Sequence, residues 1–301
     1  MTTIEVGRTE VEVPNPDKEL FPADGITKRG LADYYRQVGE VMVPNVAGRP
    51  VHMRRFPNGI EGKRLDQKQV PGHFPDWIGR VQIERRSGGA ITQAVCNDVA
   101  SLVYLAGQAC ITPHTWLSRV RSLEHPDLLV FDLDPSEGGR PDALVTAAHG
   151  LREALEQVDL EPAVKSSGSR GFHVVVPLDG SADFDEARSF ARALADVVAG
   201  RHPDELTTEQ RKDKRGRRLF LDTLRNAYGQ TVVAPYAVRA RPGAPVAAPL
   251  TWDEVNAGFD PQGVTMRNVL HRLERRGDPW QHLDRRGCSL REARQRLARS
   301  E

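Results

Sequence analysis

Cysteine is scarce in this chain of 301 residues, which has three, Cys96, Cys110 and Cys288, far apart in the sequence. An odd number of scattered thiols excludes both a disulfide framework and a zinc site built on paired cysteines, and so indicates a reducing compartment. No apolar run approaches the roughly 18 residues that a membrane-spanning helix needs. The first residues lack the basic and apolar regions of a signal peptide. These absences predict a cytoplasmic protein without membrane contact.

A large excess of charge of either sign is also missing, because 42 Lys and Arg balance 41 Asp and Glu to a formal net charge of +1. This excludes a protein that coats nucleic acid through its overall charge. The charge is uneven, however: residues 211–218 contain six basic residues and one acid, and the tail from 267 to 299 is rich in Arg. Such patches indicate a polyanion contacted at defined places, although any one of them is also explained as a solvated loop or helix face.

The segment from Leu128 to Asp134 predicts a buried apolar strand whose last residues include two acids, Asp132 and Asp134. Because side chains alternate along a strand, these carboxylates share a face and repel each other unless a cation lies between them. Hard oxygen ligands suit Mg²⁺ or Mn²⁺. A strand that presents Asp-x-Asp to a divalent metal is typical of enzymes that transfer phosphoryl groups. The alternative is a strand end with two solvated acids before a Pro turn.

Strands and helices alternate around this segment in an informative order. Apolar spacing and turn residues predict strand, helix, strand, strand, helix and strand over residues 128–134, 142–158, 163–166, 172–178, 185–199 and 218–224. This is the split βαβ unit of ferredoxin-like and RNA-recognition-motif (RRM) folds, on which many polymerase palms are built. We expect an α/β (α+β) fold with an RRM-like catalytic palm and C-terminal helical tail over residues 111–301, packed against a mixed α/β lobe over residues 1–110.

In that topology the fourth strand lies beside the first, and the third lies on the first strand's other side. Asp222 on the fourth strand would then reach Asp132 and Asp134, and His173 on the third would flank them. The three acids are the candidate metal ligands. In a two-metal mechanism one ion activates an attacking 3′-hydroxyl and the other holds the triphosphate and the leaving pyrophosphate.

The turn between the two middle strands carries Ser167, Arg170 and two glycines. Backbone N–H groups, hydroxyls and an arginine fork together match a phosphate, and the neighbouring acidic strand favours a triphosphate site over an ordinary Gly-rich hairpin. Arg215 and Arg239 are further candidate phosphate clamps, and His114 is a candidate nucleotide contact. Taken alone, an arginine of this kind is more often a surface residue, and a histidine near a tryptophan is more often a packed, hydrogen-bonded one.

Near the N-terminus, Asn15, Lys18 and Lys28 place an amide and two ammonium groups around a bend before a helix that Thr27 caps. A helix N-terminus with such neighbours is a suitable pocket for a DNA 5′-phosphate. The alternative is a turn with solvated lysines.

Together these segments resemble the primase–polymerase domain of bacterial ligase D, in the archaeo-eukaryotic primase superfamily. The resemblance covers Val13 to Leu290 and rests on separate motifs: Asn15-Pro16-Asp17-Lys18, Gly25-Ile26-Thr27-Lys28, His114-Thr115-Trp116, Phe131-Asp132-Leu133-Asp134-Pro135, Ser167-Gly168-Ser169-Arg170-Gly171-Phe172-His173, Phe220-Leu221-Asp222, Leu224-Arg225-Asn226, Ala234-Pro235-Tyr236 and Arg239-Ala240-Arg241-Pro242.

The resemblance implies template-directed nucleotidyl transfer with Mn²⁺ (or Mg²⁺), a preference for ribonucleotides, and recognition of a 5′-phosphate at a gap or break. By motif position it implies roles for twelve residues: Asp132, Asp134 and Asp222 as catalytic metal ligands, Ser167, Arg170, His173, Arg215 and Arg239 as triphosphate contacts, His114 as a nucleotide contact, and Asn15, Lys18 and Lys28 as the 5′-phosphate pocket.

Two departures from the family pattern bear on function. Break-joining relatives carry a Phe-Phe pair that stacks on the template, where this chain has Leu65 and Asp66; these cannot supply base stacking of about 1–3 kcal/mol per base. The chain also carries no ligase or nuclease module, and so resembles stand-alone polymerases that work with a separate DNA ligase. The first departure argues against synapsis of DNA ends, and with the second it places gap filling in excision repair at least level with end joining.

The sequence therefore predicts a nucleotidyltransferase of the cytoplasm and nucleoid, which adds one or a few NTP or dNTP units at 5′-phosphorylated DNA gaps during repair. The alternatives are a polymerase of non-homologous end joining, a de novo primase, and a gap-binding accessory protein without catalysis. The intact Asp132, Asp134 and Asp222 argue against the accessory protein.

Overall fold

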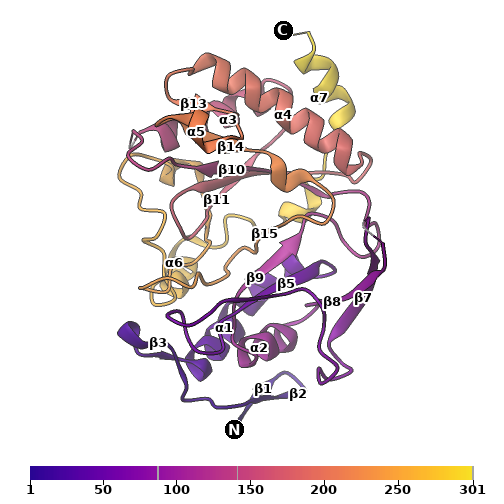
Figure 1. The fold of residues 1–301 in the computed structure, drawn as a ribbon, viewed down its shortest axis with the longest axis vertical. Helices are drawn as coiled ribbons and strands as arrows, with labels where there is room; N and C mark the ends of the chain where they lie inside the picture. Colours follow the sequence, from indigo (N-terminus) through magenta and orange to yellow (C-terminus); the bar gives the residue numbers. More distant parts are fainter. Residues whose placement is uncertain (87, 141, 300–301) are drawn as a thin grey trace. The chain divides into compact units, whose positions relative to one another are not determined.

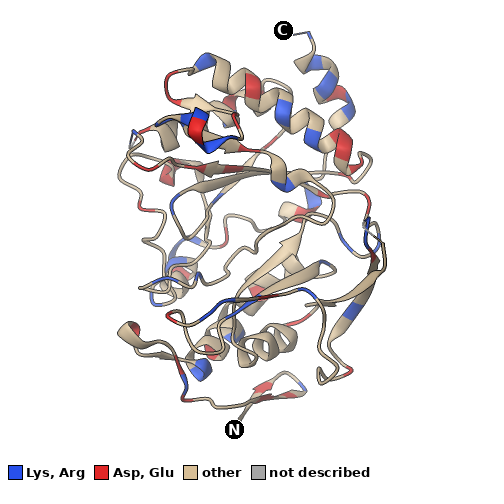
Figure 2. Ribbon diagram, viewed as in Figure 1, with Lys and Arg blue, Asp and Glu red and all other residues tan. Residues whose placement is uncertain are grey.

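The computed structural model describes residues 1–86, 88–140 and 142–299 of the protein (Figure 1). Contacts within the chain define two compact units: unit 1 comprises Met1–Arg121, Thr231–Ala247 and Val264–Asp278, and unit 2 comprises Ser122–Gln230, Ala248–Gly263 and Pro279–Glu301. Figure 2 colours the positions of the basic and acidic residues along the ribbon of both units. The lobe boundary that the sequence predicts at residues 110 and 111 stays a prediction.

A six-stranded sheet forms the centre of unit 2. Its order is β13 (Leu206–Thr207), β14 (Leu219–Asp222), β10 (Leu128–Asp134), β12 (Phe172–Pro177), β11 (Ala163–Ser166) and β16 (Pro249–Leu250). Neighbouring strands are antiparallel, apart from the parallel pair β13 and β14. The strand β10 thus lies between β12 and β14, which confirms the predicted split βαβ order.

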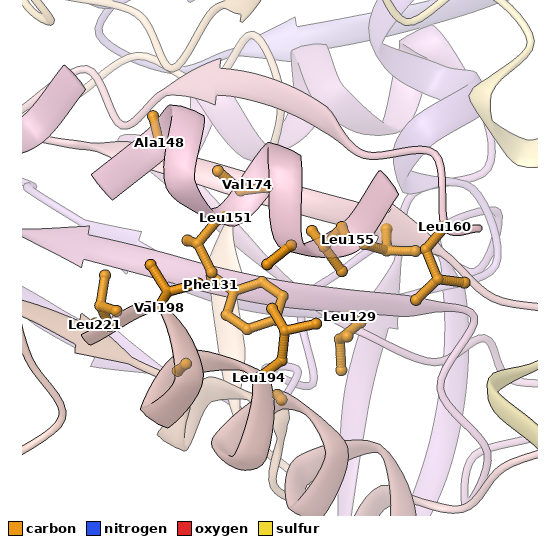
Figure 3. Close-up of a cluster of buried hydrophobic side chains, with 14 of the residues drawn as sticks. Leu129, Phe131, Ala148, Leu151, Leu155, Leu160, Val174, Leu194, Val198 and Leu221 are labelled. Carbon is orange, nitrogen blue, oxygen red and sulfur yellow. The ribbon is translucent and has the colours of Figure 1, made fainter. Parts of the chain in front are cut away.

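Two helices, α3 (Ala143–Glu156) and α4 (Phe184–Arg201), pack on one face of this sheet. Figure 3 shows Leu151 of α3 and Leu194 of α4 around Phe131 of β10. Alternate β10 residues, Leu129, Phe131 and Leu133, belong to this buried apolar cluster, so the residues between them face away from the helices. The helix α4 begins with a capping box in which Asp183 and Glu186 each bond the other's backbone N–H.

The predicted strand over residues 218–224 is shorter in the structure, because β14 ends at Asp222. The carboxylate of Asp222 accepts a hydrogen bond from the N–H of Leu224 (2.7 Å) and turns the chain into the 3₁₀ helix η2 (Leu224–Asn226). A local bond between an Asp side chain and the backbone competes with a strand in this way.

Unit 1 contains a second sheet with the order β15 (Thr231–Val233), β9 (Cys110–Trp116), β5 (Pro50–Arg55), β8 (Ala90–Val95) and β7 (Gly79–Glu84), and with β6 (Leu65–Gln67) paired to β5. Its main helices are α1 (Lys28–Val46), α2 (Val99–Gly107) and α6 (Val269–Arg276). The hydroxyl of Thr27 accepts the N–H of Gly30 at the start of α1, as the sequence predicts.

The remaining elements are two small hairpins, short 3₁₀ turns and two helices of unit 2: β1 (Thr2–Val6) with β2 (Thr9–Val13), β3 (Glu19–Phe21) with β4 (Ile26–Thr27), η1 (Pro22–Asp24), η3 (Trp252–Glu254), η4 (Leu283–Arg285), α5 (Lys212–Arg215) and α7 (Leu290–Leu297). Within the described ranges, no helix has the length and apolar character to cross a membrane.

Candidate active site and phosphate pocket

A row of polar side chains crosses the unit 2 sheet on the face opposite α3 and α4. The register pairs Lys165 with His173, His173 with Asp132, and Asp132 with Asp222. Residues paired in register point to the same face, so a buried lysine, a buried histidine and two carboxylates lie side by side. The register thus confirms the predicted adjacency of Asp132, Asp222 and His173, whereas their catalytic roles stay predictions.

The two carboxylates of this row have opposite electrostatic surroundings. Burial acts to raise the pKa of Asp132. Its neighbour His173, whose Nε2 lies 3.4 Å from Oδ1, and the charges of Arg225 and Lys165 outweigh burial. They hold the pKa of Asp132 below its ordinary value. Burial and then the charge of Asp132 raise the pKa of Asp222, in spite of a backbone hydrogen bond and the nearby arginine. Asp222 is therefore the carboxylate of the pair that takes up a proton first.

Arg225, to which the sequence motifs gave no role, lies between these carboxylates. Its Nε is 3.8 Å from Oδ2 of Asp132 and 3.8 Å from Oδ2 of Asp222. A sequence signal existed, because Arg225 follows Asp222 by three residues, the spacing of one 3₁₀ turn. The guanidinium thus supplies positive charge where the two carboxylates meet.

Asn226, which follows in the same turn, fixes the strand that carries Asp132. Its amide donates to the carbonyl of Val130 (2.7 Å) and its side-chain oxygen accepts the N–H of Val130 (2.8 Å). Asn226 is buried, so this pair of bonds substitutes for a strand ladder and satisfies both backbone groups of Val130.

The donor set of the row fits a hard divalent cation. Asp132 and Asp222 present carboxylate oxygens on adjacent strands, and like charges so placed are relieved by a cation between them. Within residues 1–86, 88–140 and 142–299, no group of three or more His, Cys, Asp or Glu side chains is close enough to hold a metal ion. Asp134 lies two residues further along β10, where Oδ1 is 3.3 Å from an Arg170 nitrogen. The three-carboxylate metal site thus stays a prediction.

The predicted phosphate-binding turn is closed by its own first serine. The hydroxyl oxygen of Ser167 accepts the N–H groups of Gly171 (3.2 Å) and Ser169 (3.3 Å), and the Ser167 N–H donates to the Gly171 carbonyl (2.9 Å). Arg170 is exposed at the tip and reaches Asp134. The structure therefore brings Ser167 and Arg170 to the end of β10 where the two acids lie.

Arg215, at the end of α5, is held in a fixed position beside the same strands. Its Nε and Nη2 donate to the carbonyls of Glu209 and Gln210, both at 2.8 Å. Its guanidinium carbon lies 3.6 Å from the ring centroid of Phe220, which pairs with Asp134 in register. The guanidinium also contributes to the electrostatics of Asp222, so its position suits the predicted role as a phosphate contact.

Two predicted nucleotide contacts belong to unit 1. His114 is buried on β9, where the register pairs it with His52 of β5 and Val233 of β15. The N–H of Arg239 donates to the carbonyl of Pro245 (2.7 Å). The contacts that the sequence predicts for His114 and Arg239 stay predictions.

The predicted 5′-phosphate pocket is formed around one bend of unit 1. The N–H of Lys28 donates to the carbonyl of Lys18 (2.9 Å), and the N–H of Lys18 donates to the carbonyl of Asn15 (3.2 Å). Asn15 has φ of +50°, a left-handed conformation that Asn adopts more readily than most residues. These bonds bring Asn15, Lys18 and Lys28 together, as predicted.

Positive charge is concentrated at this bend. The Nζ of Lys28 donates to the carbonyl of Pro14 (2.8 Å), and the Nζ of Lys18 donates to Asn58 Oδ1 (2.9 Å). Burial, followed by the charges of Lys18 and Arg55, lowers the pKa of Lys28. Arg55 comes from β5 and was missed in the sequence, because it lies 27 positions after Lys28. An anion would relieve the repulsion among these three cations.

The two residues that replace the aromatic pair of the family pattern lie on β6. Leu65 is 42% exposed. Asp66 accepts from Nε of Arg64 (2.8 Å), and its other oxygen lies 3.2 Å from Nε2 of His52 and 3.7 Å from Nε of Arg54. Asp66 is thus the centre of an ionic cluster rather than a stacking surface.

Comparison with known proteins agrees with this geometry. A family model described as "LigD, primase-polymerase domain" matches residues 27–280. The chain belongs to this family. As a LigD primase–polymerase domain it is a nucleotidyltransferase of the polymerase type.

Similar proteins include the "Multifunctional non-homologous end joining protein LigD" of Mycolicibacterium smegmatis, 37% identical over 278 residues. Another is the "Bifunctional non-homologous end joining protein LigD" of Bacillus subtilis, 30% identical over 267 residues. The matches cover 91% and 88% of this chain, but only 36% and 42% of those proteins. This chain therefore corresponds to one part of each relative.

A solved structure covers the same extent as this chain. The "Polymerase Domain from Mycobacterium tuberculosis Ligase D in complex with DNA" superposes with a TM-score of 0.87 at 32% sequence identity. The match includes 92% of this chain and 99% of that domain.

Proposed function

We propose that this LigD primase–polymerase domain adds one or a few nucleotides, preferably ribonucleotides, to the 3′-end at a short DNA gap with a 5′-phosphate. The observation that carries the proposal is the direct pairing of Asp132 with Asp222 on the central strands of the sheet. The bound DNA of the similar M. tuberculosis domain supports DNA as the partner. The product would be a nick with a 3′-hydroxyl and a 5′-phosphate, which a separate ligase would seal.

In this proposal Asp132, Asp134 and Asp222 hold Mn²⁺ or Mg²⁺. Bound there, either ion would supply Lewis-acid chemistry, namely a lower pKa of the attacking hydroxyl and charge neutralisation at the triphosphate. The chain's own part is positioning and charge balance. Asn226 fixes β10 through Val130, so that Asp132 is presented at a defined place.

The cations beside the acids would bind the triphosphate. Arg170 at the turn and Arg215 on α5 offer planar guanidinium groups of the kind that bind phosphate through paired hydrogen bonds. Arg215 is already held by two carbonyls and an aromatic ring, so little conformational freedom is lost on binding. The buried His173 is next to Asp132 and is the third contact in this group.

The pocket of Asn15, Lys18 and Lys28 would hold the 5′-phosphate that marks the far side of the gap. Burial is the main cause that lowers the pKa of Lys28, and the charges of Lys18 and Arg55 add to it, so positive charge gathers beside this amine. A phosphate with two negative charges balances that charge, whereas a 5′-hydroxyl does not. This difference supports selection of phosphorylated gaps.

End joining is the second candidate function, and the printed names of the full-length relatives favour it. Leu65 and Asp66 on β6 do not offer the aromatic stacking surface of break-joining relatives. Gap filling and end joining are separated by comparing one continuous gapped duplex with two unjoined ends that have complementary overhangs.

The test is insertion of a labelled ribonucleotide into a one-nucleotide gap, with and without a 5′-phosphate, in the presence of Mn²⁺. Asp222→Asn would be compared with Asp185→Asn, because Asp185 is an exposed acid in the first turn of α4. We expect phosphate-stimulated insertion that Asp222→Asn loses and Asp185→Asn keeps. Gap binding without insertion by the wild-type chain would overturn the proposal in favour of an accessory protein.

A further inference from the structure

A stripe of polar and basic side chains runs along α6 in unit 1, outside the residues assigned above. Asn268, His271, Arg272, Arg275 and Arg276 line, with Val264, a depression of about 280 Å³. Their spacing of three and four residues places them on one face of the helix. Figure 2 shows the basic residues of this helix in blue.

This stripe has a strong excess of positive charge. Residues 267–276 contain four arginines, and Glu274 is the one acid of that segment. Glu274 lies 3.7 Å from Nδ1 of His271, so its charge is directed to the histidine. Arg267, Arg275 and Arg276 are exposed, which places the excess charge in contact with solvent.

The stripe is connected to the element that carries the 5′-phosphate pocket. The guanidinium of Arg267 donates to the carbonyl of Asp24 (2.7 Å), and the carboxylate of Asp24 accepts the N–H of Gly243 (2.9 Å). Asp24 ends η1, from which β4 leads directly to Lys28 at the start of α1. The helix α6 therefore begins two residues after an arginine that is bonded to the turn before Lys28.

We propose that α6 is a second DNA contact of unit 1, which binds the phosphate backbone of the duplex downstream from the 5′-phosphate. A helix of eight residues is about 12 Å long at 1.5 Å per residue. Phosphates of one DNA strand follow each other at about 3.4 Å along the duplex axis, so this length matches about three of them. The inference rests on the proposed function, because a 5′-phosphate in the Lys18–Lys28 pocket leads the downstream strand to α6.

The chemistry of the stripe favours a duplex backbone over a small ligand. Its lining contains one aliphatic side chain, Val264, whereas pockets for small molecules are mostly apolar and enclosing. Repeated arginines at the surface suit a repeated phosphate, which each guanidinium can bind through two hydrogen bonds. Contacts to phosphates carry no base information, so the contact is expected to be independent of DNA sequence.

The experiment measures DNA binding rather than catalysis. The full chain is titrated against fluorescent gapped DNA whose downstream arm has about 12 base pairs (long-arm DNA). The comparison is a DNA without downstream duplex, whose template ends one nucleotide past the gap (short-arm DNA) and so offers α6 no duplex backbone. Arg275→Glu is compared with Arg188→Glu, an exposed arginine of α4 in unit 2, and with Arg275→Lys, which keeps the charge.

We expect Arg275→Glu to weaken binding of the long-arm DNA about fivefold or more near physiological salt, and to reduce the slope of log Kd against log salt by about 1. Arg275→Lys and Arg188→Glu should resemble the wild type, and the short-arm DNA should bind all four proteins alike. Equal loss with both arms, or equal loss in Arg188→Glu, would overturn the inference.

The two proposals fail in different ways. If the wild type distinguishes 5′-phosphate from 5′-hydroxyl and inserts nucleotides, but Arg275→Glu binds the long arm normally, the α6 inference is wrong and the proposed function stands. If insertion is absent while Arg275→Glu selectively loses long-arm binding, α6 is a DNA contact and the catalytic proposal fails.

Discussion

Asp132 and Asp222 are direct partners across β10 and β14, yet their pKa values move in opposite directions. Burial acts to raise both, but at Asp132 it is outweighed by His173, Arg225 and Lys165. At Asp222 burial dominates, and the charge of Asp132 adds to it. The pair is therefore arranged so that Asp132 stays ionised while Asp222 is the proton-sensitive member.

This asymmetry predicts the pH dependence of metal binding. A carboxylate must be deprotonated to bind Mn²⁺, so affinity should fall as the pH falls through the raised pKa of Asp222. Arg225→Gln removes a cation that lowers the pKa of both acids, so the loss of affinity should begin at a higher pH than in the wild type. Calorimetric titration with Mn²⁺ at several pH values measures the shift.

Arg188→Gln, on an exposed face of α4, is the matched control and should leave the pH profile unchanged. A profile for Arg225→Gln that coincides with the wild type would show that Arg225 does not act on the two carboxylates.

Insertion by Asp132→Asn should fall by about 100-fold, the equivalent of about 3 kcal/mol of lost transition-state stabilisation.

Gly171 is required by a close backbone approach beside the same acids. A Cβ at this position would lie 1.9 Å from the carbonyl oxygen of Leu133, between Asp132 and Asp134. Gly171→Ala should therefore displace β10 and lower the free energy of unfolding by about 3 kcal/mol, with loss of insertion. Urea unfolding and the insertion assay measure the two effects.

Gly200→Ala is the control for that prediction. Gly200 lies in α4, and no atom is within 4 Å of a Cβ placed there. Alanine in a helix interior should stabilise the protein by about 0.5–1 kcal/mol relative to glycine. If Gly171→Ala were as stable and as active as Gly200→Ala, the close approach to Leu133 would not constrain the site.

The central part of the fold was predictable because its pattern is local. Alternation of Leu129, Phe131 and Leu133 with Asp132 and Asp134 determines the faces of β10, and its bounds agree with the prediction. The strand order then follows from a known topology, which is why Asp222 was expected beside Asp132. The bounds of α3 and α4 differ from the predictions by one or two residues, because helix ends depend on capping bonds.

The parts of the site that the sequence did not predict depend on contacts between distant segments or on turn geometry. Arg225 reaches the acids because Asp222 bonds the N–H of Leu224 and starts a 3₁₀ turn. Arg55 joins the positive pocket from β5 through the packing of unit 1. Residues 231–247 and 264–278 belong to unit 1 although they follow β14, the last strand of the split βαβ unit, in sequence, and no local pattern indicates that return.

The charged Lys28 of the proposed 5′-phosphate pocket should lower the free energy of unfolding of the protein. Burial and then two neighbouring cations lower the pKa of Lys28 from 10.5. At a pH between the lowered pKa of the folded state and the ordinary pKa of the unfolded chain, the unfolded chain binds more protons than the folded protein. The free energy of unfolding therefore increases with pH in this window, and at lower pH the folded protein bears the full cost of the charged lysine. Lys28→Met removes this dependence, so any stability advantage over the wild type should shrink as the pH approaches 10.5.

The same variant tests the anion site. Inorganic phosphate should raise the Tm of the wild type, because a ligand that binds the folded state stabilises it, and should have little effect on Lys28→Met. Lys212→Met on α5, an exposed lysine of unit 2, should respond to phosphate as the wild type does. A Tm increase of equal size in all three proteins would place phosphate binding elsewhere.

Restoring aromatic side chains on β6 should have different effects at its two positions. Leu65 is exposed, so Leu65→Phe adds a stacking surface and should tighten binding to a template base, up to the roughly 1–3 kcal/mol that stacking contributes. Asp66→Phe removes the acid next to His52, Arg54 and Arg64. Its loss should lower the Tm, because Arg54, which is partly buried, loses an ion-pair partner.

Fluorescence of 2-aminopurine opposite the gap measures stacking, and thermal unfolding measures the cost. Asp66→Asn keeps the size of the side chain without its charge and should lose stability as Asp66→Phe does, whereas Leu65→Met should gain no stacking. If Asp66→Phe instead stacked on the template at full stability, the ionic cluster would not be what holds β6. The charge of Asp66 would then not be required to keep β6 in place.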